Sequence, residues 1–166
     1  MAKFKGENRQ VVGISDMKVS KNPKEHLITV SLGSCIGIAI WDHVAKVGGL
    51  LHYMLPDSRL DKERARSNPY MFGDSGIPML FKMAYRLGAS KQNMTVRVVG
   101  GSQLMDSAGI FNIGQRNYEI AKLLFAKNSI TPVKVDIGGS VNRTMSVDVA
   151  TGQVILKVSG SGEIEI

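Results

Sequence analysis

Three short apolar runs that follow one another closely constrain the fold of this chain most. Leu27–Ser31, Ile36–Trp41 and Gly48–Leu55 have the length and the apolar or β-branched composition of strands. A glycine-rich turn separates the first two runs, and the polar segment Asp42–Lys46 separates the last two. The short polar loop Asp42–Lys46 is typical of a hairpin between antiparallel neighbours, because parallel strands need a crossover of about a dozen residues. The sequence therefore predicts a largely antiparallel sheet centred on this hairpin.

The rest of the chain alternates further strands with two amphipathic helices. One helix is expected to be capped at its N-terminus by Asp74 or Ser75, and the other covers Ile113–Lys127. The inward residues of the first helix recur every three or four positions: Ile77, Leu80, Phe81, Ala84 and Leu87. The further predicted strands are Gln10–Ser20 (with a glycine kink), Val96–Val99, Val133–Ile137, Thr144–Val149 and Val154–Val158. Hairpins and helices in this order predict an α+β layered fold, in a single domain of residues 1–166.

Two segments show no regular pattern. Residues 56–76 are rich in charge and are interrupted by Asn68-Pro69. Such a stretch is typical either of a solvated, partly helical connector or of a functional loop such as a lid. The tail, residues 159–166, is rich in glycine and serine. We expect it to be loose.

Composition narrows the class of protein. The 166 residues are 43% apolar, with one cysteine and no run close to the ~20 apolar residues that span a bilayer. Met1–Asn8 lacks the apolar stretch of a signal peptide, and one cysteine cannot form an internal disulfide, so we expect a cytoplasmic protein without membrane insertion. The net charge of +7 suits an acidic partner. Scattered basic residues and few aromatics do not favour nucleic acid.

Cys35 and His52 are the residues of most chemical interest. Cys35 lies in the turn between the first two apolar runs, and His52 lies within the third. His26 and His43 have polar surroundings and are expected at the surface. A cysteine in a glycine turn is either packing filler or a nucleophile, and a histidine in an apolar strand is either a core residue or a base. Residue type alone leaves both alternatives open.

Hairpin geometry connects the two residues. Directly opposed residues of an antiparallel pair have a constant sum of residue numbers, so parity decides which residues share a face. Cys35 and His52 share a face if Asp42 pairs with Ala45 or Val47, and not if it pairs with Lys46. The small residues that alternate after Cys35 favour a same-face register, with ~5–8 Å between the two β-carbons. A Cys–His hydrogen bond at that range would lower the thiol pKa.

The backbone around Cys35 also suits a nucleophile. Gly33 allows a sharp turn, Gly37 leaves the adjacent surface bare, and the N–H groups near Ser34 and Cys35 would be placed to receive an oxyanion. A glycine-dependent bulge in which Cys35 is filler explains the same residues. Both interpretations stay open on these grounds.

The same segments resemble one bacterial family. Thr29–Gly37 and Gly49–Pro56 are similar to the chemoreceptor glutamine deamidases, CheD. The similarity covers about Val11–Val158, and it continues through Gly100-Gly101-Ser102, Ile113–Asn117, Asp136–Gly139, Arg143 and Thr151-Gly152. Ser58–Arg66 departs from the family pattern, so residues that contact substrate there cannot be assigned. The resemblance implies an α/β/α-layered fold with a central, mostly antiparallel β-sandwich, like that of bacterial toxin deamidases.

The resemblance also implies an activity. It is the hydrolysis of selected glutamine side chains to glutamate on chemoreceptor cytoplasmic helices, without a metal or organic cofactor. The nucleophile maps onto Cys35, the general base onto His52 and a supporting hydroxyl onto Thr29, with Gly33 and Ser34 supporting the oxyanion. Some members also bind a CheC-type phosphatase. Two alternatives remain: a non-catalytic adaptor that binds receptors or the phosphatase, and a thiol enzyme of another specificity.

Overall fold

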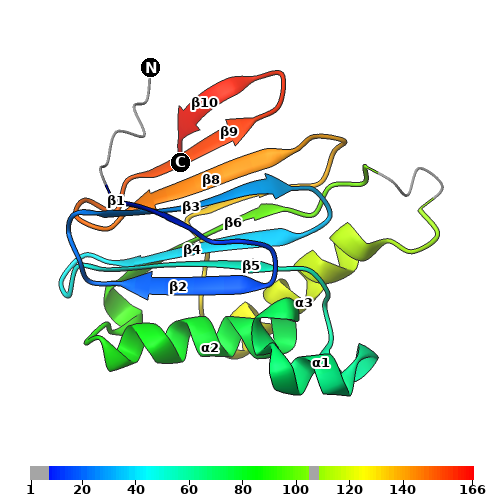
Figure 1. Ribbon diagram of the computed structural model, residues 1–166, viewed down its shortest axis with the longest axis horizontal. Helices are drawn as coiled ribbons and strands as arrows, with labels where there is room; N and C mark the ends of the chain where they lie inside the picture. The colour runs from blue at the N-terminus through cyan, green and yellow to red at the C-terminus, as the bar shows by residue number, and fades with distance from the viewer. Residues whose placement is uncertain (1–7, 105–108) are drawn as a thin grey trace.

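Two five-stranded sheets dominate the computed structural model, which describes residues 8–104 and 109–166 (Figure 1). The segment behind the signal-peptide expectation therefore lies almost wholly outside the described residues. Sheet A contains, in spatial order, β1 (Asn8–Val11), β3 (Glu25–Leu32), β8 (Arg143–Asp148), β9 (Val154–Val158) and β10 (Gly162–Glu165). Sheet B contains β2 (Asp16–Ser20), β5 (Val47–Tyr53), β4 (Ile36–Asp42), β6 (Met94–Gly100) and β7 (Lys134–Ile137). The helices are α1 (Lys62–Ser67), α2 (Gly73–Arg86) and α3 (Ile113–Lys127), with 3₁₀ turns η1 (Ser58–Leu60), η2 (Pro69–Met71) and η3 (Lys91–Asn93).

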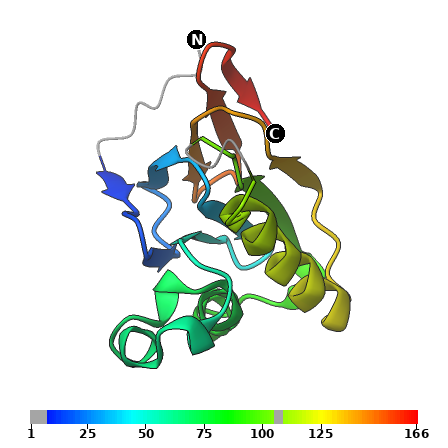
Figure 2. The same ribbon diagram turned by 90° about the vertical axis from the view of Figure 1, so that its right-hand side faces the viewer.

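The elements form three layers in the order sheet A, sheet B, helices. Two strand pairs, β1–β3 and β6–β7, are parallel and the others are antiparallel. The predicted α+β class and mostly antiparallel sandwich are confirmed. The described helices gather on the side of sheet B (Figures 1 and 2), rather than on both sides of the sandwich. The outer face of sheet A carries polar side chains such as His26, Asp148 and Lys157.

Two apolar clusters hold the layers together. Alternation along β4 sends Ile36, Ile38 and Ile40 toward the helices, where they pack with residues of α2 and α3. The intervening Ala39 faces sheet A and joins the cluster between the sheets. That inter-sheet cluster also contains Leu27, Leu50, Val99, Met145, Val147 and Leu156. Each large side chain buried in this way contributes about 1.5–3 kcal/mol relative to exposure.

The two main helices follow their sequence patterns, with one difference at a cap. α3 has the predicted bounds. α2 begins at Gly73, ahead of the expected cap residues, and Phe72 at its N-cap makes no side-chain hydrogen bond to the helix. Asp74 lies in the first turn instead and accepts hydrogen bonds from the N–H and Oγ of Ser58, at 2.9 and 2.7 Å. Its carboxylate therefore fastens η1 to α2.

The expectations for Gln10–Ser20 and for the tail are corrected, and the helical alternative holds for residues 56–76. Gln10–Ser20 is two strands, because the chain crosses from sheet A to sheet B between β1 and β2. The charged segment 56–76 is mostly helical, since it contains η1, α1, η2 and the start of α2. The tail is not loose: Gly160 and Gly162, with φ of 80° and 83°, turn the chain so that β10 pairs antiparallel with β9.

Candidate active site

The β4–β5 hairpin brings Cys35 and His52 to one face. Asp42 pairs with Val47 and Gly37 with His52, so the same-face register is confirmed. Cys35 directly precedes β4, and its carbonyl oxygen accepts a hydrogen bond from the Gly101 N–H at 2.9 Å. Cys35 packs against the inter-sheet cluster, and His52 is fully buried. The thiol and the imidazole therefore lie at the same end of the sandwich, between the two sheets.

Thr29 reaches His52 from the opposite sheet. It lies on β3 of sheet A, and its Oγ1 is 2.7 Å from the His52 Nδ1 on β5 of sheet B. The same hydroxyl donates to the Val12 carbonyl oxygen at 2.7 Å. Because its only proton is used there, Thr29 must accept from the imidazole, so Nδ1 carries the proton. The Nε2 atom of neutral His52 is therefore left with a lone pair.

The thiol and the imidazole are both neutral at pH 7. Burial lowers the pKa of His52 to about 4. Burial also raises the pKa of the Cys35 thiol, against a smaller lowering by the Cys35 backbone N–H. The His52 Nε2 has no hydrogen-bond partner among the described residues. The expected Cys–His hydrogen bond and lowered thiol pKa are thus wrong for this state, in which desolvation outweighs any stabilisation of the thiolate.

Hydrogen bonds fix the backbone carbonyl groups of the turn that contains Cys35. The Gly33 carbonyl accepts from the Ser102 N–H at 2.9 Å, and the Ser34 carbonyl accepts from the Asn117 Nδ2 at 3.0 Å. Neither the Ser34 N–H nor the Cys35 N–H donates to a backbone carbonyl of the described residues. The Cys35 N–H lies close enough to its own sulfur to lower the thiol pKa. This leaves two donors beside the thiol, as an oxyanion site requires.

Glycines let other backbone segments approach this turn. A Cβ on Gly100, whose φ is +118°, would lie 2.2 Å from the Cys35 carbonyl oxygen. A Cβ on Gly37 would lie 2.8 Å from the Leu32 Cδ1. The φ of Gly33 is not left-handed, so the backbone conformation of the turn does not require glycine at this position, contrary to expectation. Its Cβ would instead lie 3.0 Å from the Leu104 Cδ1, in the neighbouring loop.

Cys35 lines a pocket of about 540 Å³. Polar groups of Ser31, Ser34 and Ser102 share its wall with the apolar side chains of Leu104 and Phe111, both of which are exposed. Ser31 lies at an irregularity in the β3–β8 register and has a φ of 58°, a feature typical of bulges beside functional sites. Nothing in the sequence pattern pointed to this pocket, because its wall comes from loops far apart in the chain.

The first turn of α3 also faces the pocket. Ile113 and Gly114 line it, and α3 is 15 residues long. The N-terminal end of such a helix carries a partial positive charge of roughly half a unit. A Cβ on Gly114 would lie 2.4 Å from the Gly101 carbonyl oxygen, so glycine permits the helix to sit this close. The arrangement favours negative charge developing near Cys35.

The other histidines lie outside the site. The His26 Nδ1 is 3.9 Å from the Asp148 carboxylate on the outer face of sheet A, and the His43 Nδ1 is 2.8 Å from the Asn93 carbonyl oxygen. Among the described residues, no cluster of three or more His, Cys, Asp or Glu side chains is placed to hold a metal ion. None of the helices in residues 8–104 and 109–166 has the length and apolar character to cross a membrane.

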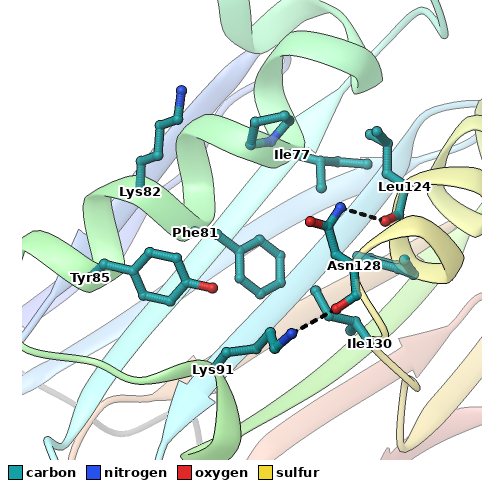
Figure 3. Close-up of a pocket in the computed structure, with 10 residues that line it drawn as sticks. Ile77, Phe81, Lys82, Tyr85, Lys91, Leu124, Asn128 and Ile130 are labelled. Carbon is teal, nitrogen blue, oxygen red and sulfur yellow. Dashed lines mark hydrogen bonds between the residues drawn. The ribbon is translucent and has the colours of Figure 1, made fainter.

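A second hollow, of about 260 Å³, lies between α2 and α3 (Figure 3). Phe81 and Tyr85 line it from α2, and Leu124 lines it from α3. Of the two described lysines that line it, Lys82 and Lys91, the second donates to the Asn128 carbonyl oxygen at 2.8 Å. The described residues that line this hollow include no cysteine and no histidine, so it offers neither a thiol nucleophile nor an imidazole base.

Comparison with known proteins identifies the family. A family model described as CheD chemotactic sensory transduction matches residues 54–158. A protein of Syntrophus aciditrophicus (strain SB), called probable chemoreceptor glutamine deamidase CheD 1, is 49% identical over 150 residues, which are 90% of this chain and 94% of the relative. Relatives called probable chemoreceptor glutamine deamidase CheD are 40% identical in Solibacter usitatus (90% and 89% covered) and 41% identical in Desulforamulus reducens (95% of each covered).

Among solved structures, a Neisseria meningitidis protein aligns over 89% of this chain and 72% of its own, with a TM-score of 0.46 and 9% identity. This likeness is too low to carry an argument. The sequence relatives are far closer, and each covers most of both chains. This chain belongs to the CheD family.

Proposed function

We propose that this protein hydrolyses the side-chain amide of selected glutamines on chemoreceptors, forming glutamate and ammonia. The relatives named as chemoreceptor glutamine deamidases support this activity. The observation that carries the mechanism is the state of His52. Its Nδ1–H is fixed on Thr29, and its unpartnered Nε2 lies on the same face as the only cysteine of the chain. This arrangement suits a thiol nucleophile with a general base.

The first half of the reaction forms a thioester. The His52 Nε2 takes the Cys35 thiol proton as the sulfur attacks the glutamine δ-carbon, and the carbonyl π electrons move to oxygen. The N–H groups of Ser34 and Cys35 stabilise this oxyanion, beside the N-terminal end of α3. The intermediate collapses as the C–N bond breaks, and the proton on Nε2 passes to the departing nitrogen. Ammonia leaves, and the acyl group stays on Cys35.

The second half consumes water. Neutral His52 takes a proton from a water molecule as the water oxygen attacks the thioester carbon. Collapse breaks the C–S bond, and the sulfur recovers the proton from Nε2. The net reaction is glutamine plus water to glutamate plus ammonia. Thr29 acts throughout by holding one tautomer of the imidazole, because its hydroxyl accepts only from a protonated Nδ1.

The proposed setting follows from the substrate. Glutamines of chemoreceptor cytoplasmic helices are reached from the cytoplasm, so we infer a cytoplasmic location. We also propose that the chain forms a single deamidase domain. The net charge of +7 favours encounter with helices rich in glutamate. A CheC-type phosphatase is a proposed regulatory partner, on the strength of the family resemblance alone.

The activity is tested on the cytoplasmic fragment of a chemoreceptor. The fragment is incubated with the wild-type protein, with Cys35→Ala and with the matched histidine variants His52→Ala and His43→Ala, and conversion is followed by peptide mass spectrometry. We expect glutamine-to-glutamate conversion with the wild type and with His43→Ala, and none above background with the other two variants. Binding of the fragment without conversion by the wild-type protein would instead favour the non-catalytic adaptor.

A further inference from the structure

Two buried side-chain polar atoms lack a hydrogen-bond partner in the described part of the chain: His52 Nε2 and Asn117 Oδ1. Unpaired buried polar atoms are rare, and each one in a native structure calls for an explanation. The proposed mechanism explains the free Nε2 as the proton acceptor. It gives no role to Asn117, which lies on α3 and is fully buried.

Both N–H donors of the Asn117 side chain are used on backbone carbonyls. Its Nδ2 donates to the Ser34 carbonyl oxygen at 3.0 Å and to the Met54 carbonyl oxygen at 2.9 Å. An amide turned the other way would press Oδ1 against two carbonyl oxygens, so only one orientation is possible. The Tyr53 hydroxyl donates to the Asn117 backbone oxygen at 2.5 Å and fastens this turn of the helix. Oδ1 has no partner among the described residues because both N–H donors of the Asn117 amide are directed at the two ends of the β4–β5 hairpin.

The two carbonyls belong to the segments that carry the nucleophile and the base. Ser34 precedes Cys35, and Met54 follows β5 two residues after His52. The last pair of the β4–β5 ladder is Ile36 with Tyr53, so both carbonyls lie beyond the last rung. Asn117 therefore closes the open end of the hairpin, where the ladder no longer fixes the backbone.

The Ser34 carbonyl and the Cys35 N–H are part of one rigid peptide unit. The described residues contain no cis peptide, so this carbonyl and N–H point in opposite directions. A hydrogen bond that holds the carbonyl oxygen on Asn117 thus sets the direction of the N–H, which lies beside its own sulfur. Rotation of this peptide would carry the N–H away from the place where the oxyanion forms.

We infer that Asn117 is a positioning residue for the deamidation reaction. By fixing the Ser34–Cys35 peptide, it aims the Cys35 N–H at the developing oxyanion. It does not touch the substrate. This role rests on the proposed function, and it depends on the two hydrogen bonds from the Asn117 amide to the Ser34 and Met54 carbonyl oxygens.

The test separates oxyanion stabilisation from reactivity of the thiol. Asn117→Leu keeps the approximate volume and removes both donors. We expect kcat for deamidation to fall about 10- to 100-fold, with KM little changed. This loss would be no larger than the loss caused by deleting an oxyanion-hole donor. Alkylation of Cys35 by iodoacetamide builds no oxyanion and depends on thiolate content, so its rate should stay within about threefold of the wild type.

Ala121→Gly is the matched control for stability. Ala121 lies one turn further along α3 than Asn117 and is also fully buried. Its replacement by glycine leaves the Asn117 amide in place. We expect it to lower the melting temperature while kcat is retained. Asn117→Ser, whose hydroxyl can donate to only one carbonyl, serves the same comparison if the leucine variant does not fold.

Two results would overturn the inference alone. One is a folded Asn117 variant with wild-type kcat, and the other is a parallel loss of deamidation and alkylation, which indicates general disorder of the site. A wild-type protein that converts no glutamine would overturn the proposed function, and this inference with it. The wild-type measurement therefore separates the two failures.

Discussion

Replacing Thr29 by valine should lower both the stability of the protein and the ability of His52 to act as a base. Valine has nearly the shape of threonine, but it removes the hydroxyl that joins the two sheets at the site. The Val12 carbonyl and the His52 Nδ1–H would then be buried without partners, since Thr29 and His52 are both fully buried. The imidazole would also be free to adopt the other tautomer or to turn.

The size of the effect follows from the two lost hydrogen bonds. Each buried polar group left unpaired costs about 1–3 kcal/mol, and the added methyl group returns less than about 1 kcal/mol. We therefore expect Thr29→Val to lower the free energy of unfolding by about 2–4 kcal/mol. We expect kcat to fall by roughly 10²-fold or more, because a base in the wrong tautomer cannot take the thiol proton.

Thr29→Ser provides the control. Serine retains the hydroxyl that accepts from Nδ1 and donates to the Val12 carbonyl, so only a methyl group is lost, at about 1 kcal/mol. Urea unfolding gives the stability, and glutamine conversion on a receptor fragment gives kcat. A valine variant as active as the serine variant would refute the assignment of Thr29 as the residue that orients the base.

Further predictions concern pH, a close backbone contact and the tail. Unfolded His52 binds a proton near pH 6.5 and folded His52 only near 4, so stability should fall by about 3 kcal/mol as the pH drops through that window, and His52→Gln should remove most of this slope. Alkylation of Cys35 should accelerate only as the thiol ionises above pH 9.0; a rate plateau that extends to neutral pH would indicate a preformed ion pair instead. Gly100→Ala should cost about 2–4 kcal/mol in urea unfolding, and Gly139→Ala, with a φ of 74° but open space around it, clearly less; equal costs would contradict the contact with Cys35. Deleting residues 160–166 should destabilise the protein by about 1–2 kcal/mol, because Ile166 packs against the inter-sheet cluster and accepts from Arg97; an unchanged midpoint would show that β10 contributes nothing.

Local patterns predicted what depends on local geometry. The same-face placement of Cys35 and His52 could be predicted because parity within a hairpin leaves few registers, and the small residues after Cys35 favoured the same-face ones. The observed closing pair is Asp42–Val47. The bounds of α3 follow from its apolar stripe. The strand in the tail had a signal that was outweighed by its glycines, namely the alternation of Glu163, Ile164, Glu165 and Ile166.

Contacts between distant segments could not be derived in this way. Thr29 meets His52 across the two sheets, and only the family resemblance suggested it. The protonation states differ from the expectation because burial, which the sequence does not reveal, outweighs any Cys–His attraction. Asn117 had one usable signal: it lies one turn before Ala121, on the inward face of α3, where a polar residue needs partners.

Detection of the acyl-enzyme tests the central claim most directly. The wild-type protein is mixed with a receptor fragment, quenched with acid during turnover, digested and analysed by mass spectrometry. The account predicts a substrate peptide joined through a thioester to Cys35, released by hydroxylamine and missing from Cys35→Ala, which should also convert no glutamine. Full conversion by Cys35→Ala would contradict the claim that this thiol is the nucleophile.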